Sequence, residues 1–153
     1  MKRSNIASVL TTLVLALGLV AAASAQNTTC SNATLNGSFG YSSTGTLLKS
    51  YVLPPFAGPF AEVGIQTFDA SSGTTSATAT LSSNGNIVSV TVTGTYTVNA
   101  DCTGTLTLLI SPFGAVVHAN LVIDKNGNAF QAIETEPDLI VTRMAWRQFS
   151  NSQ

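Results

Sequence analysis

A strict alternation of apolar and hydroxyl side chains over residues 88–98 constrains the fold more than any other feature of this chain. Valine, glycine and tyrosine occupy the even positions, and serine and threonine occupy the odd ones. Side chains of a strand point to opposite faces with a period of two, so this segment has one dry face and one wet face. Residues 99–102 supply turn chemistry, and residues 103–110 start a second strand. Residues 87–110 are therefore predicted to form a β-hairpin.

The first 25 residues have the pattern of a secretory signal peptide. Two basic residues precede an apolar run over residues 6–20, and Ala-Ser-Ala at 23–25 matches the small-x-small cleavage pattern. A membrane anchor is the alternative, but the run is shorter than the roughly 20 apolar residues of a spanning helix. We expect a mature chain that begins at Gln26, is secreted or periplasmic after cleavage near Ala25, and has no membrane span.

The remaining 128 residues are enough for one domain with a hydrophobic core. They keep four basic and seven acidic residues, a net charge of about −3. A nucleic-acid partner is not expected, because such proteins present a basic patch and this chain has none. Low charge together with abundant threonine and serine fits a β-rich exported protein. The predicted organisation is an N-terminal arm (26–34), a β-barrel domain (35–149) and a short tail (150–153).

The chain has two cysteines, Cys30 and Cys102. In an exported protein we expect them to form one disulfide, which would tie the N-terminal arm to the tip of the hairpin. A metal site is not expected, because the chain has a single histidine and no Cys-x-x-Cys pair.

The period of two recurs along the rest of the mature chain. Asn84-Gly85 is a strong hairpin signal, because both central residues of a tight hairpin turn take positive φ. On strand 60–69 the inward face stays open, since Val63 and Ile65 lie on one side while Phe60 and Phe68 lie on the other. The predicted strands cover residues 35–43, 60–69, 74–82, 88–98, 103–110, 115–123, 128–135 and 139–149.

Eight consecutive strands joined mostly by tight turns predict an all-β fold. An open sheet of this size would expose two edges to aggregation. An even number of antiparallel strands lets the last strand pair with the first, so an eight-stranded antiparallel up-and-down barrel, calycin-like, removes both edges. A β-sandwich is the alternative, although sandwiches usually need longer crossing connections than the one long loop seen here.

Several motifs carry a family resemblance. They are residues 33–41 (Ala-Thr-Leu-Asn-Gly-Ser-Phe-Gly-Tyr) after Cys30, Phe68-Asp69 before a glycine turn, and residues 94–105 (Gly-Thr-Tyr-Thr-Val-Asn-Ala-Asp-Cys-Thr-Gly-Thr). With them the mature chain resembles a group of small, mostly uncharacterised proteins secreted by soil bacteria such as acidobacteria. More distantly, the strand layout is similar to lipocalin-type and allene-oxide-cyclase-type barrels. The resemblance implies an exported barrel and carries over no catalytic residue.

Residues 47–59 contain three prolines, which exclude a central strand, yet they are unusually apolar for a loop. We expect a long connection that folds back over the core. Its Tyr51 and Phe56, with Phe60 just after it, suit a lid or plug beside the barrel mouth. A loop that simply covers core residues is the alternative.

Polar candidates for a ligand site are few. Glu134 and Arg143 lie on neighbouring predicted strands and could pair either on the surface or inside the barrel, where Glu62 and Gln66 could join them. His118 is expected to face solvent, and the reversed register would place it inside. The candidate ligand-binding residues, which include two tyrosines on predicted inward faces, are Tyr41, Tyr51, Phe56, Phe60, Tyr96, Glu134 and Arg143.

Three functions remain open. A secreted barrel could hold a small apolar ligand, since an eight-stranded barrel can enclose one and several inward residues are small. A filled barrel could serve as a structural or interaction module through its threonine-rich outer surface. A cyclase-like enzyme would require an inward Glu or His close to Tyr96. No catalytic residue is assigned and no cofactor is expected. The small inward positions are Ala77, Ala79, Gly94, Ala115 and Ala119.

Overall fold

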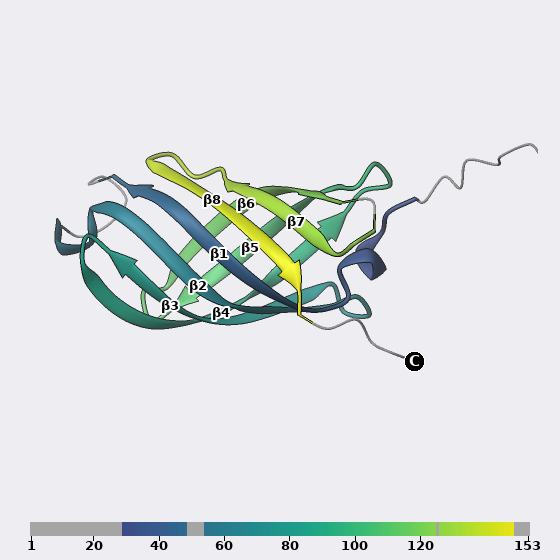
Figure 1. Cartoon of the computed structure of the whole chain (residues 1–153), viewed down its shortest axis with the longest axis horizontal. Helices are drawn as coiled ribbons and strands as arrows, with labels where there is room; N and C mark the ends of the chain where they lie inside the picture. Colours follow the sequence, from purple (N-terminus) through teal and green to yellow (C-terminus); the bar gives the residue numbers. More distant parts are fainter. Residues whose placement is uncertain (1–28, 49–53, 125, 149–153) are drawn as a thin grey trace, which may run out of the picture.

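The computed structural model describes residues 29–48, 54–124 and 126–148, which form one closed β-barrel (Figure 1). The predicted signal peptide, the predicted mature start at Gln26, Tyr51 and the tail lie outside the described residues. Within the described ranges, no helix has the length and apolarity needed to cross a membrane.

Eight antiparallel strands follow one another around the barrel in sequence order, and the last pairs with the first. The predicted up-and-down barrel is therefore confirmed, and the sandwich alternative is wrong. The strands are β1 (Gly37–Leu47), β2 (Gly58–Asp69), β3 (Thr74–Ser83), β4 (Asn86–Val98), β5 (Thr103–Ser111), β6 (Ala115–Ile123), β7 (Ala129–Glu134) and β8 (Leu139–Arg147). Two short 3-10 helices, η1 (Asn32–Leu35) and η2 (Pro54–Phe56), lie at opposite ends of the barrel (Figure 1).

The alternation of β4 separates inside from outside as predicted. Val90, Val92 and Tyr96 are buried, and the hydroxyl residues between them are exposed. On β2 the structure settles the open question, because Phe60, Glu62, Gln66 and Phe68 turn inward. Val63 and Ile65 lie on the outer surface, where they are 64 % and 50 % exposed. Hydropathy could not decide this face, because β2 carries large apolar residues on both sides.

The prolines of the connection are not all outside the sheet, which corrects one expectation. Pro59 is the second residue of β2 and pairs with Thr46 of β1. The pairing of β2 with β3 begins only at Phe60, so Pro59 has a single ladder neighbour. A proline is tolerated at such an edge because its missing N–H interrupts no second ladder.

Aromatic rings close one end of the barrel. Phe39, Phe68, Phe130 and Tyr96 pack edge to face with ring centroids 5.0 to 5.6 Å apart. Such pairs each contribute about 0.5–1.5 kcal/mol beyond the burial of their area. Leu35, expected to begin the first strand, instead lies in η1 and is fully buried against this cluster. We call these five residues the aromatic plug.

The disulfide and Arg147 help to hold η1 and residues 29–34 of the N-terminal arm over the aromatic plug. Cys30 and Cys102 form the predicted disulfide, with Cα atoms 5.0 Å apart. Arg147 donates from Nη2 to the carbonyl oxygens of Thr34 (2.9 Å) and Gly127 (2.7 Å), and from Nη1 to that of Asn36 (2.6 Å). Residues 29–34 of the arm are therefore part of the closed end.

The sequence led us to expect that the small inward residues leave space for a ligand, but most of them do not. Ala77, Ala79 and Ala119 belong to the packed core. A Cβ at Gly94 would lie 2.1 Å from the carbonyl oxygen of Thr107, so this glycine permits close approach of β4 and β5. Only Ala115 of the five lines the cavity described next.

Candidate functional site

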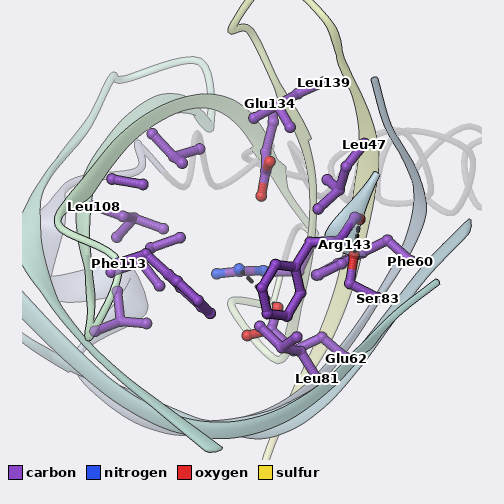
Figure 2. Close-up of a pocket in the computed structure, with 15 residues that line it drawn as sticks. Leu47, Phe60, Glu62, Leu81, Ser83, Leu108, Phe113, Glu134, Leu139 and Arg143 are labelled. Atoms are coloured by element: carbon purple, nitrogen blue, oxygen red, sulfur yellow. Dashed lines mark hydrogen bonds and ion pairs between the residues drawn. The ribbon is translucent and has the colours of Figure 1, made fainter. Parts of the chain in front are cut away.

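A cavity of about 260 Å³ occupies the end of the barrel opposite the aromatic plug and is partly open to solvent. Its walls are mostly apolar, with four polar residues among them (Figure 2). The apolar lining residues are Leu47, Phe56, Phe60, Leu81, Val92, Leu108, Ile110, Phe113, Ala115, Val117 and Leu139, and the polar ones are Glu62, Ser83, Glu134 and Arg143.

Two aromatic rings from different loops meet at this cavity. Phe56 of η2 and Phe113 of the β5–β6 turn pack with ring centroids 5.6 Å apart. Side chains of the β3–β4 hairpin hold η2, since Ser83 Oγ donates to the carbonyl oxygen of Phe56 (2.5 Å) and Asn86 Nδ2 to that of Pro55 (2.5 Å). The described part of the predicted lid therefore does line the mouth, at Phe56 and Phe60.

Arg143 of β8 is the centre of a buried polar cluster and is 7 % exposed. Its Nε donates to Ser43 Oγ (3.1 Å) and its Nη1 to Gln66 Oε1 (3.1 Å), while Nη2 lies 3.5 Å from Glu62 Oε2. The guanidinium carbon lies 4.2 Å from the centre of the Tyr41 ring, and the Tyr41 hydroxyl donates to Glu62 Oε1 (2.9 Å). The positive charge of Arg143 is thus balanced by Glu62.

Tyr41 acts as a hydrogen-bond donor in this cluster. Burial, together with the negative charge of Glu62, raises the pKa of Tyr41 well above its usual range. The hydroxyl therefore keeps its proton at physiological pH and holds the Glu62 carboxylate in place. This arrangement suits a positioning role and does not supply a base.

Glu134, the last residue of β7, points its carboxyl group from the wall into the cavity (Figure 2). Among the residues that the structure describes, no hydrogen bond or ion pair joins this carboxyl group. Burial raises its pKa to about 7, and the charges of Glu62 and Glu136 add to the rise, while Arg143 opposes it. The carboxyl group therefore changes its charge near neutral pH.

The predicted pair of Glu134 and Arg143 is corrected in one respect. Both side chains lie inside the barrel, but the ion pair of Arg143 is with Glu62. Ala132 is the direct partner of Arg143 across β7 and β8, and the guanidinium extends towards β1 and β2. Glu134 is left as a second, separate carboxyl group of the cavity.

Tyr96, another candidate, does not line the cavity. It is part of the aromatic plug, and its hydroxyl donates to the carbonyl oxygen of Asn32 (3.0 Å). The inward carboxyl groups, those of Glu62 and Glu134, lie at the other end of the barrel with Arg143. The arrangement that a cyclase-like site would need at Tyr96 is therefore not present among the described residues.

His118 lies on the outer surface, as expected, and the reversed register is wrong. Its side chain is 54 % exposed, and its Nδ1 atom pairs with Oε1 of Glu136. Within the described ranges, no group of three or more His, Cys, Asp or Glu side chains could hold a metal ion.

Several cavity-lining residues were not identified from the sequence, and these lie at strand ends or in a turn. Leu47, Ser83 and Leu139 are the terminal residues of β1, β3 and β8 on the mouth side, and Phe113 lies in the turn between β5 and β6. Their position in the predicted topology could have identified them. In an up-and-down barrel, the end of one strand and the start of the next lie at the same rim, so these residues gather at the mouth.

Comparison of the chain with models of known protein families, with curated proteins and with solved structures finds no match.

Proposed function

We propose that this protein binds a small, mostly apolar molecule in the barrel cavity, with one polar group of the ligand directed at the buried charged side chains. The observation that carries the proposal is the contrast between the two ends of the barrel. One end is filled by the aromatic plug, while the other keeps a cavity of about 260 Å³ with charged groups among its apolar walls. Apolar walls with a few placed polar groups are typical of small-molecule sites.

The size of the cavity limits the ligand. An apolar cavity of about 150 Å³ can hold benzene, so this cavity suits a molecule of about ten non-hydrogen atoms. Burying eight methylene groups would contribute about 6 kcal/mol at about 0.8 kcal/mol each. Loss of ligand freedom offsets part of this gain, so we expect dissociation constants in the micromolar to millimolar range.

We further propose that the protein works outside the cytoplasm. The pattern of the first 25 residues supports export, and the disulfide between Cys30 and Cys102 suits an oxidising compartment. A secreted or periplasmic barrel with this cavity would carry or sequester its ligand without changing it.

A titration followed by ¹H–¹⁵N NMR tests the binding proposal. Compounds with octyl and 3-phenylpropyl bodies, each as alcohol, amine and carboxylate, are added to residues 26–153 with the disulfide intact. We expect saturable shifts of cavity residues such as Leu81, Leu108 and Val117, with little change at Phe39 and Phe130 of the aromatic plug. If no compound of either series gives saturable shifts at the cavity, the proposed function is wrong.

A further inference from the structure

From the charges inside the barrel we infer that the ligand carries an amine, whose ammonium group pairs with the Glu134 carboxylate, and that a carboxylate ligand is disfavoured. This inference rests on the proposed function, because it assigns the polar group of the ligand held in the same cavity. Two observations carry it: the charge of Arg143 is already balanced, and the carboxyl group of Glu134 is not.

Arg143 is the obvious partner for a carboxylate ligand, but its contacts argue against that role. All three of its nitrogen atoms face groups of the protein: Ser43, Gln66 and Glu62. One face of the guanidinium lies on the Tyr41 ring. A ligand carboxylate would have to displace Glu62 or share the cavity with it, and like charges at short range in a low-dielectric site are unfavourable.

Glu134 has the opposite character. It lines the cavity, and no described residue donates a hydrogen bond to its carboxyl group or lies within ion-pair distance of it. An ionised carboxylate among apolar walls is costly unless a cation or a donor accompanies it. An ammonium group supplies a positive charge and three hydrogen-bond donors, which are the partners that the Glu134 carboxylate lacks among the described residues.

Counting the charges that face the cavity gives the same preference. Arg143 and Glu62 cancel, so Glu134 decides whether the interior is neutral or carries one negative charge. Glu136, the other nearby carboxyl group, points outward and pairs with His118, and Tyr41 keeps its proton. When Glu134 is ionised, the net negative charge of the cavity attracts an ammonium ligand. The cavity has no net positive charge in either state of Glu134, so it does not attract a carboxylate ligand.

The preference has a pH signature. An alkylamine stays protonated up to about pH 10, as lysine does. Below about pH 7 the ammonium must displace the proton of Glu134, so amine affinity should fall about tenfold for each pH unit. An alcohol with the same body gains no ion pair, so its affinity should not fall on acidification.

Isothermal titration calorimetry with octylamine, 1-octanol and octanoate, and with the three 3-phenylpropyl analogues, tests this inference. At pH 8 we expect the amine to bind at least tenfold more tightly than the carboxylate, with the alcohol between them. Glu134→Gln should weaken amine binding at least tenfold and change alcohol binding less than threefold. Glu136→Gln, the matched substitution on the outer surface, should leave both unchanged.

The outcomes separate this inference from the proposed function. If the alcohol or the carboxylate binds and the amine is no tighter than the alcohol, the charge preference is wrong and cavity binding stands. If none of the compounds binds, cavity binding itself is wrong. Should Glu134→Gln fail to fold, the wild-type pH profile decides, since an amine affinity that is flat from pH 8 to pH 5.5 contradicts the pairing with Glu134.

Discussion

The Nη2 atom of Arg143 lies 3.5 Å from the Oε2 atom of Glu62, and both side chains are only 7 % exposed. The two residues belong to β8 and β2, which are not neighbours, because β1 lies between them. The ion pair therefore crosses the inner face of β1, where Tyr41 and Ser43 contribute hydrogen bonds. It links three strands from the inside, next to the floor of the cavity.

Breaking this pair on one side should destabilise the barrel strongly. Arg143→Met leaves the Glu62 carboxylate buried without its cation, and we expect the free energy of unfolding to fall by about 3–5 kcal/mol. Adding Glu62→Gln should recover part of the loss, since it removes the unpaired charge. Urea unfolding at pH 7 measures both variants.

The exposed pair on the outer surface is the control for the buried one. Glu136→Gln removes the negative charge that pairs with His118, and we expect a much smaller loss of stability than for Arg143→Met, because exposed ion pairs contribute little. An Arg143→Met protein as stable as the wild type would show that Arg143 and Glu62 do not form a buried pair.

Glu134 should make stability fall as pH rises. Its pKa is about 7 in the folded protein against 4.5 as the ordinary value, so the folded state holds the proton more tightly over this range. The free energy of unfolding should therefore decrease by about 3 kcal/mol between pH 4.5 and pH 8. Urea unfolding of the wild type and Glu134→Gln at four pH values tests this.

The variant should be nearly independent of pH in that window. The pKa values of Asp69, Asp101 and Glu136 are lowered by hydrogen bonds, so the stability they contribute is lost only in more acidic solution. Equal pH dependence in the wild type and in Glu134→Gln would mean that the Glu134 carboxyl group is solvated.

The sequence predicted the strands because the alternation of polarity is a local signal, and the even number of strands then predicted closure of the barrel. On β4 each residue differs in polarity from its neighbours, so the alternation predicts both that the segment is a strand and which of its faces points inward. The signal fails on β2, where Val63 and Ile65 are exposed while Glu62 and Gln66 point inward. Hydropathy places charged residues outside, but β2 carries Glu62 inside and Asp69 outside, so hydropathy left the inner face of this strand undecided.

The partners of Arg143 could be predicted only in part. The sequence paired Arg143 with Glu134 and allowed Glu62 and Gln66 to join them inside the barrel, and the structure shows Arg143 with Glu62 and Gln66. Neighbouring strands suggested Glu134, but a long side chain inside a barrel reaches strands that are not its neighbours, as Arg143 does towards Gln66 and Glu62. Which contact forms depends on register and on the space left by other side chains. Neither can be read from the spacing of residues along the chain.

Loss of the disulfide should weaken the closed end without removing the barrel. Cys30 and Cys102 are 72 residues apart, and a loop of this length corresponds to about 4 kcal/mol in the chain-entropy account. The Cys30→Ser/Cys102→Ser variant should lose about this much on urea unfolding, and wild-type protein with reduced cysteines should match it. Stability unchanged by both treatments would show that the arm is held by other contacts, such as those of Arg147.

Two alanines of the same strand test where the free space lies. Ala115 and Ala119 both point into the barrel from β6, but Ala115 lines the cavity and Ala119 lies in the packed core. Ala115→Phe should place its ring in the cavity, lower the affinity for octylamine and for 1-octanol at least tenfold, and change stability by less than about 2 kcal/mol. Ala119→Phe should prevent folding or cost more than about 3 kcal/mol, because no space receives the ring.

Ala61→Phe, on the outer face of β2, is the matched control and should leave binding and stability unchanged. Calorimetry and urea unfolding on the three variants measure both quantities. If Ala115→Phe kept full affinity for both compounds, ligands would bind outside this cavity. If Ala119→Phe folded as well as Ala115→Phe, the core of the barrel would not be packed as the structure describes. The pair of alanines therefore tests the division of the barrel into a filled end and a hollow end, on which the proposed binding depends.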